Sequence, residues 1–239
     1  ISYLRDVVRS ATEVREKLDC NFLGEIPHEN KFKTPSAFVR KQKSSILMTS
    51  PVTGFRFVES IRKLRRRVEK HLGSAKVLMV TSLLENEGKS TTVGNIALAL
   101  ADRGNKVALL DMDFKKPALH KVFDMQGEDL MDLATLISGQ ATLDTYQFCS
   151  YRQSGLDLAL NKKSYNNYVE WIYTDKMAGI FEQLRQSEKY DFIIVDTPPL
   201  SVAADVTGIV HLSDVSMLVV RTDYVYTAAI NDAVLSLSE

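Results

Sequence analysis

The sequence lacks several features that would point to particular classes of protein. It has only two cysteines, Cys20 and Cys149, which form no metal-binding or redox pair, so neither a disulfide framework nor a zinc cluster is expected. No apolar run approaches the roughly 20 residues that a membrane helix needs. The 30 basic residues balance the 30 acidic ones, so the overall charge favours no nucleic acid or other polyanion as a partner.

The composition that remains is ordinary for a globular protein, with 45% hydrophobic and 25% charged residues in a chain of 239. Residues 1–54 are predicted to form an N-terminal arm. Apolar residues at helical spacing indicate an amphipathic helix over 1–20, and a polar, irregular link follows it. The main domain is expected over 55–239, and its first element is an amphipathic helix over 55–72 with many basic residues on its outer faces.

From residue 76 onward the pattern alternates between strands and helices. Strands are predicted over 76–82, 106–111, 156–160, 191–196 and 215–221. Helices are predicted over 89–103, 129–138, 174–188, 203–212 and 227–238. The strand candidates are continuously apolar, which is typical of strands buried on both faces of a parallel sheet. The sequence therefore predicts an α/β fold in which a mostly parallel sheet lies between two layers of helices.

A phosphate-binding loop is expected where the first of these strands runs into a helix, at SLLENEGKST, residues 82–91. Backbone N–H groups and the helix dipole attract phosphate there, Lys89 would reach the β- and γ-phosphates, and Ser90 would bind Mg²⁺. Leu83 replaces the first glycine of the G-x-x-x-x-G-K-[ST] pattern, whereas Asn86 tolerates a left-handed backbone. The candidate nucleotide-binding residues of this loop are Asn86, Glu87, Gly88, Lys89, Ser90 and Thr91.

Carboxylates follow two of the other predicted strands. Asp196 opens the sequence D-T-P-P, Asp111 ends the strand over 106–111, and Asp113 lies two residues further on. Because ligands bind at the carboxyl ends of parallel strands, we expect these three acids to converge with Lys89 as catalytic residues. Asp111 and Asp113 should point the same way, and a cation would relieve their repulsion. Candidate Mg²⁺ ligands are Ser90, Asp111 and Asp196, and Asp111 or Asp113 is the candidate base for an attacking hydroxyl.

Together these motifs resemble those of the bacterial protein-tyrosine kinases of the polysaccharide co-polymerase type, the BY-kinases. Their motifs are S-x-x-P-G-E-G-K-S-T, apolar-D-x-D-x-R-x-P and D-T-P-P. In the second motif Lys115 stands in place of the family's arginine, so a nucleotide contact is expected with the charge kept but the bidentate geometry lost. The helix over 55–72 fits the family's E-x-x-R-x-x-R segment, which implies that Glu59, Arg62 and Arg65 drive ring assembly. From the residues alone, that basic face reads more simply as a solvated surface.

The resemblance implies an ATP- and Mg²⁺-dependent autokinase that phosphorylates tyrosines of neighbouring subunits in a ring. It further implies control of capsular or exopolysaccharide assembly and export, and a cognate phosphotyrosine phosphatase. The stretch 23–27, LGEIP, resembles the segment that follows the membrane helix in relatives. We therefore expect the cytoplasmic piece of a longer inner-membrane protein, with its sensor region in the same polypeptide. The family's tyrosine-rich tail is not found in these 239 residues.

Two alternatives stay open. One is a MinD/ParA-like ATPase switch, although that family needs an extra lysine early in the loop, where this chain has Leu84. The other is a nucleotide-binding scaffold with weak catalysis, which the departures at Leu83, Glu85 and Lys115 suggest.

Overall fold

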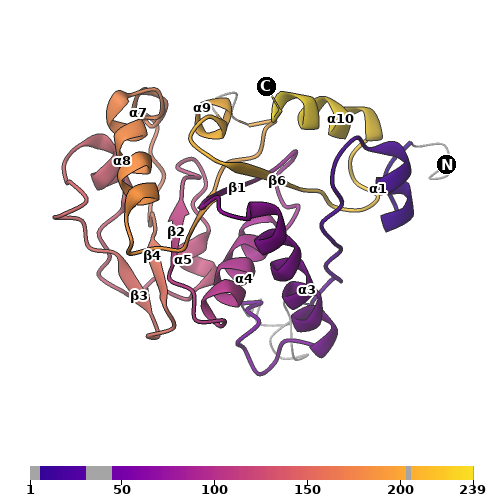
Figure 1. Cartoon of the computed structure of the whole chain (residues 1–239), viewed down its shortest axis with the longest axis horizontal. Helices are drawn as coiled ribbons and strands as arrows, with labels where there is room; N and C mark the ends of the chain where they lie inside the picture. The colour runs from indigo at the N-terminus through magenta and orange to yellow at the C-terminus, as the bar shows by residue number, and fades with distance from the viewer. Residues whose placement is uncertain (1–5, 31–44, 203–205, 239) are drawn as a thin grey trace.

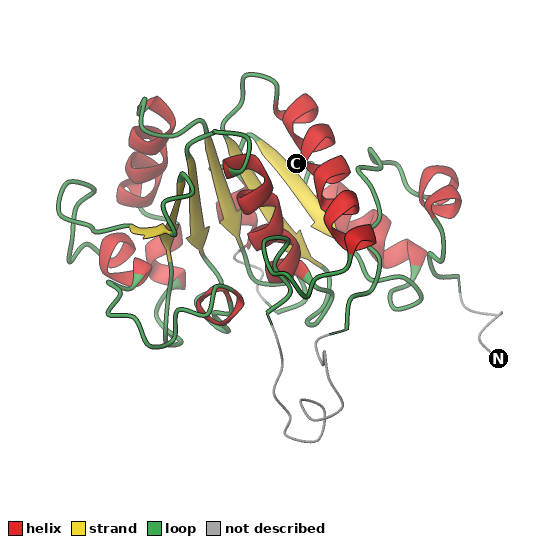
Figure 2. Ribbon diagram, turned by 90° about the horizontal axis from the view of Figure 1, so that it is seen from below, coloured by secondary structure: helices red, strands yellow, loops and turns green. Residues whose placement is uncertain are grey.

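A parallel sheet forms the centre of the molecule (Figures 1 and 2). The computed structural model describes residues 6–30, 45–202 and 206–238, and the sheet within them has six strands. In spatial order these are β3 (Cys149–Tyr151), β4 (Leu156–Ala159), β2 (Val107–Asp111), β5 (Phe192–Asp196), β1 (Val77–Ser82) and β6 (Val215–Val219). All neighbouring pairs are parallel except β3, which runs antiparallel to β4. The predicted parallel sheet is confirmed.

Helices cover both faces of this sheet. One face packs against α6 (Leu133–Ser138), α7 (Val169–Ile172), α8 (Asp175–Gln186) and α9 (Val206–Val210). The other face packs against α3 (Phe55–Leu72), α4 (Lys89–Ala101) and α5 (Leu119–Val122). Successive residues of a strand point to opposite faces, and β1 accordingly sends Val77 and Met79 into the first core and Leu78 into the second. The predicted three-layer arrangement is therefore confirmed.

Helix α4 is apolar on almost every side because it lies between the sheet and α3. A helix hydrophobic all round is expected in such a buried position. Its one buried amide, Asn95, is paired with the segment before α3. Its Nδ2 donates to the carbonyl of Ile46 at 2.8 Å, and its Oδ1 accepts the N–H of Met48 at 2.6 Å. The end of the arm is thereby attached to the helix that begins at the phosphate loop.

The N-terminal helix is shorter than predicted. Of the predicted range 1–20, residues 1–5 lie outside the described residues, and α1 covers only Ala11–Lys17. The Ser10 side chain caps its start by accepting the N–H of Glu13. Val7 instead pairs as an isolated bridge with Tyr226, directly before α10 (Thr227–Ser236), so α1 and α10 lie side by side (Figure 1).

Other differences are local. The helix predicted over 129–138 begins only at Leu133, because Asp132 is extended and its carboxylate accepts the Tyr165 hydroxyl and the Lys162 N–H. The strand predicted over 215–221 ends at Val219, and residues 203–205 of the helix predicted over 203–212 are outside the described residues. The short elements β3, α5 and α7 were not predicted. No helix in the described part of the chain is long and apolar enough to span a membrane.

Candidate active site

The loop between β1 and α4 has a backbone that leaves room for a phosphate. Asn86 (φ 64°) and Gly88 (φ 90°) are both left-handed, as the sequence suggested for Asn86. A Cβ built on Gly88 would meet no atom within 4 Å. Gly88 lines a cavity of about 590 Å³ together with Asn86, Lys89, Ser90 and Thr91. The open side of the loop therefore faces a space large enough for a nucleotide.

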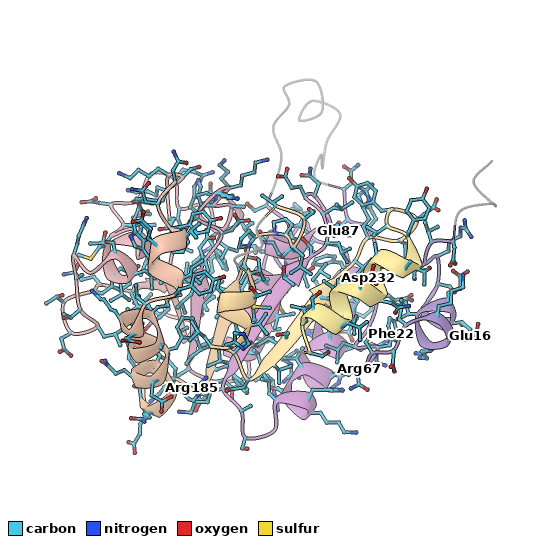
Figure 3. The ribbon with its side chains drawn as sticks, turned by 90° about the horizontal axis from the view of Figure 1, so that it is seen from above. Glu16, Phe22, Arg67, Glu87, Arg185 and Asp232 are labelled. Atoms are coloured by element: carbon cyan, nitrogen blue, oxygen red, sulfur yellow. The ribbon has the colours of Figure 1, made fainter. Side chains whose placement is uncertain are left out.

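Glu87, which was predicted to bind nucleotide, also makes contacts that hold the loop. It lines the same cavity, but Oε2 accepts the Leu84 N–H at 2.7 Å and Oε1 accepts the Arg221 N–H at 3.1 Å. Burial raises the pKa of this carboxyl, and the two backbone N–H groups oppose that effect. Glu87 (labelled in Figure 3) links the phosphate loop, of which it is part, to the segment before α10. It therefore holds the loop in shape, since both oxygens already have partners.

Lys89 lies at the centre of the predicted constellation. Its Nζ is 2.5 Å from Asp196 Oδ1, 3.6 Å from Asp113 Oδ2 and 3.4 Å from Ser90 Oγ. Asp111 is the register partner of Asp196 on the neighbouring strand, so its carboxylate ends β2 beside the one that ends β5. The structure thus brings together the four residues predicted to be catalytic and the predicted metal-binding hydroxyl.

Burial and mutual charge interactions shift the pKa values of the residues in this cluster. Burial raises the pKa of Asp111 well above its usual value, and repulsion from Asp196 and Asp113 raises it further. Burial also raises the pKa of Asp113, against the opposing attraction of Lys89. For Lys89, burial alone would lower the pKa, but Asp196 and Asp113 outweigh burial and raise it. The ammonium group is therefore held charged, and it compensates acids that would otherwise repel one another.

The donor set fits a magnesium ion bound together with a nucleotide. Asp111 Oδ1 and Asp196 Oδ2 are buried and have no hydrogen-bond partner in the described structure. Such orphan oxygens are costly unless a proton or a cation satisfies them. The described residues contain no cluster of three or more His, Cys, Asp or Glu side chains suited to a metal. Mg²⁺ bound with phosphates needs only one or two carboxylates, because phosphate oxygens and water complete its shell.

The two lysines after Asp113 have distinct contacts. Lys115, predicted to bind nucleotide, lines the cavity, but its Nζ donates to the carbonyl of Val202 at 2.8 Å and lies 5.7 Å from the ring centroid of Tyr168. Lys116 forms an ion pair with Glu85 of the phosphate loop at 2.6 Å. This exposed pair joins the two loops that flank the cavity.

Sequence reasoning missed Asn161, which is fully buried after β4. Its Nδ2 donates to the backbone carbonyl of Asp111 at 2.8 Å, and its Oδ1 accepts the Ala134 N–H at 3.0 Å. It therefore fixes the backbone that carries the Asp111 carboxylate. The signal was present, because a polar residue directly after a buried apolar strand is the same pattern that identified Asp111 and Asp196.

The predicted assembly residues lie on α3, outside the cavity lining. Glu59 and Arg62 form an ion pair at 2.8 Å with both side chains partly exposed. Arg65 differs, because its side chain is only 10% exposed and its Nη1 contacts both carboxylate oxygens of Glu69, at 3.0 and 2.9 Å. Glu59 and Arg62 are thus accessible to a neighbour, whereas Arg65 already has a partner within its own helix.

Replacing Gly88 by alanine tests whether the loop binds phosphate, and a control variant shows which effects come from backbone strain alone. A left-handed alanine costs about 1–2 kcal/mol, and the new methyl group would occupy the open side of the loop. We expect at least a tenfold loss of ADP affinity by titration calorimetry. Gly104→Ala is the matched control, since Gly104 has nearly the same φ of 89° and the same open surroundings after α4. The Gly104→Ala protein should lose similar stability yet bind ADP normally. Equal ADP affinity in both variants would contradict a phosphate-binding role for the open side of the loop.

Comparisons with known proteins find relatives in sequence and in fold. Residues 74–235 match the family model ParA, described as the NUBPL iron-transfer P-loop NTPase. The chain is 30% identical over 187 residues to the tyrosine-protein kinase YwqD of Bacillus subtilis (strain 168), covering 77% of this chain and 75% of that protein. It is 25% identical over 220 residues to the tyrosine-protein kinase ptk of Acinetobacter johnsonii, covering 91% of this chain but only 29% of ptk. The chain thus spans less than a third of the length of that relative.

Two solved structures show the same fold. The BceF tyrosine kinase domain superposes with a TM-score of 0.81 at 22% identity, covering 97% of this chain and 93% of that one. The septum site-determining protein MinD from Pyrococcus horikoshii, complexed with Mg-ADP, superposes with a TM-score of 0.51 at 21% identity. That match covers 60% of this chain and 57% of MinD.

Proposed function

This chain belongs to the bacterial tyrosine kinases within the ParA-like P-loop NTPases, and from that premise we propose that it transfers the γ-phosphoryl group of ATP to protein tyrosines. The observation that carries the proposal is the contact of Lys89 with Asp196, Asp113 and Ser90 at the mouth of the phosphate loop. Phosphoryl transfer needs mainly positioning and neutralisation of charge. An ammonium group beside several acids and a hydroxyl supplies both.

Each residue of the site has its own proposed role in this transfer. Lys89 would bind the β- and γ-phosphates and stabilise the charge that develops on the transferred group. Ser90 and Asp196, with Asp111, would hold Mg²⁺, which supplies neutralisation of the phosphate oxygens when bound. Asp113 is more exposed than Asp111 and would accept the proton of the tyrosine hydroxyl. Its raised pKa makes it a stronger base than an ordinary aspartate.

The proposal extends to the wider setting that the resemblance implied. We propose that the chain is the cytoplasmic part of a longer membrane protein, that it phosphorylates neighbouring copies in a ring, and that it regulates capsular or exopolysaccharide export. One relative is a putative tyrosine-protein kinase in the cps region of Klebsiella pneumoniae, and another is the tyrosine-protein kinase CpsD of Streptococcus pneumoniae. A phosphotyrosine phosphatase would reverse the reaction.

The test is incubation with γ-labelled ATP, Mg²⁺ and a tyrosine peptide. Label in phosphotyrosine supports the kinase. Release of free phosphate without labelled tyrosine would instead support an ATPase switch, the alternative that the ParA match and the MinD fold favour. Tight ATP binding with neither product would indicate a scaffold.

Charge exchange on α3 tests ring assembly. Arg62→Glu places two carboxylates one turn apart and should abolish oligomers in analytical ultracentrifugation. The double variant Glu59→Arg/Arg62→Glu restores an i, i+3 ion pair within the helix but reverses the charges that a neighbour meets, so it should also be monomeric. Lys70→Glu, at the other end of α3, is the control. If the double variant assembled like the wild type, the pair would act only within its own helix.

A further inference from the structure

A second cavity, which we call the lysine groove, lies beside the nucleotide cavity. Its volume is about 360 Å³, and its walls come from the segments that follow β2 and β4. It is lined by Lys116, Pro117, Ala118, His120, Lys121, Lys162, Lys163 and Ser164. Lys116, Ala118 and Lys121 also line the nucleotide cavity. The two spaces therefore share a wall.

The lysine groove is lined by positively charged side chains. Four of its eight lining residues are lysines and none is acidic. Lys116 is paired with Glu85, whereas Lys162 Nζ donates to the neutral carbonyl of Glu128 at 3.1 Å and Lys163 Nζ lies 5.4 Å from the ring centroid of Tyr165. Both of these lysines are exposed. The groove therefore presents ammonium groups that have no carboxylate contact among the described residues.

The lysine groove lies next to Asp113, the residue proposed to accept the proton of the tyrosine. The backbone N–H of Lys116 donates to Asp113 Oδ1 at 3.0 Å, so the groove begins next to the acid that faces Lys89. A tyrosine that approaches this acid across the segment 116–121, which contributes to both cavities, brings its neighbouring residues over the lysine groove. Those neighbours then lie within reach of the lysines, which attract carboxylates.

We propose that the lysine groove binds carboxylates next to the acceptor tyrosine, so that this chain selects tyrosines in acidic segments of its protein substrates. The inference rests on the proposed kinase function and adds the class of substrate to it. A competing use of these lysines is to hold nucleotide phosphates. Lys116 and Lys121 are placed for either use, but Lys162 and Lys163 line only the second cavity. They are therefore the residues to change.

The experiment compares three peptides with the same central tyrosine and flanking residues that are all Glu, all Gln or all Lys. For the wild type we expect a KM about tenfold lower for the Glu peptide than for the Gln peptide, with similar kcat, and a difference that shrinks as salt screens the charges. Lys162→Glu/Lys163→Glu should lose this preference and favour the Lys peptide, with unchanged ADP affinity. The control Lys70→Glu/Lys106→Glu makes the same change of charge near the amino ends of the strands and should keep the preference.

A binding measurement separates the groove from the catalysis. A fluorescent Glu peptide with Phe in place of the tyrosine should bind about tenfold more weakly to Lys162→Glu/Lys163→Glu than to the wild type, by fluorescence anisotropy. Equal binding to both proteins overturns the proposal, and so does a matching loss of ADP affinity in the variant. If the wild type binds this peptide selectively yet phosphorylates none of the three, the kinase proposal fails while the groove stands.

Discussion

Replacing Lys89 by methionine is expected to abolish tyrosine phosphorylation and also to destabilise the fold. Without the ammonium group, charge on the transferred phosphoryl loses its main protein partner, so we expect transfer to fall by about 10³-fold or more. The same change leaves Asp196 and Asp113 without their cation in a site where Lys89 is only 7% exposed. Removing one partner of such a buried pair costs about 3–5 kcal/mol, which urea denaturation at pH 7 would measure.

The pH dependence of this stability loss has a definite sign. The raised pKa of Lys89 means that its pairing stabilises the native state below its unfolded pKa and is lost only as the pH rises through the folded value. As the pH falls instead, Asp111 and Asp113, whose pKa values are raised, take up protons and need the cation less. The gap between wild type and Lys89→Met should therefore narrow at pH 5. Lys106→Met, at an exposed lysine, is the control, and a constant gap at both pH values would contradict this account.

Replacing Asp111 by asparagine should stabilise the protein while it removes activity. Asp111 is fully buried and its pKa is raised well above the usual value. The native state therefore holds this proton more tightly than the unfolded state does, so this carboxyl lowers stability as the pH rises from about 4 through the raised pKa. Asparagine keeps the shape, can still accept the Leu119 N–H and introduces N–H donors among the acids. We expect a gain of about 1–3 kcal/mol at pH 7.

The activity of the same variant should fall by at least 100-fold, because a neutral amide is a poor Mg²⁺ ligand and cannot balance the site's charge. Coupled measurement of urea midpoints and phosphotyrosine formation checks both halves. Asp102→Asn, at an exposed acid after α4, should change neither. A variant that is less stable than the wild type at pH 7 would mean that Asp111 is held as a useful anion by groups other than those described.

Much of the fold and site could be predicted because the signals are local. Continuous apolar runs identified the five parallel strands, the phosphate-loop pattern identified Lys89, and acids at the carboxyl ends of strands identified Asp111, Asp113 and Asp196. The short elements were missed because helices of four residues and a three-residue edge strand carry too few residues for a period to be visible. The N-terminal helix was overextended because Val7 fits a helical stripe, yet its tertiary partner Tyr226 holds it in a bridge.

The sequence motifs could not predict which groups each side chain contacts. The motif placed Glu87 and Lys115 at the nucleotide, but the loop geometry gives Glu87 two backbone donors and gives Lys115 the Val202 carbonyl. The E-x-x-R-x-x-R spacing treats its two arginines alike, whereas Arg65 lies on the buried side of α3 and Arg62 on the exposed side. Such differences depend on which neighbours the fold supplies, and sequence spacing alone does not contain them.

Asp111 and Asp196 are paired across adjacent strands, and this pairing affects how the protein should lose activity on heating. Neither acid is carried by a flexible loop, and the pairing of β2 with β5 sets how far apart their backbones lie. Warming should therefore leave the chemistry intact until the sheet itself separates. Inactivation and loss of the β-sheet signal in circular dichroism should then occur at the same temperature.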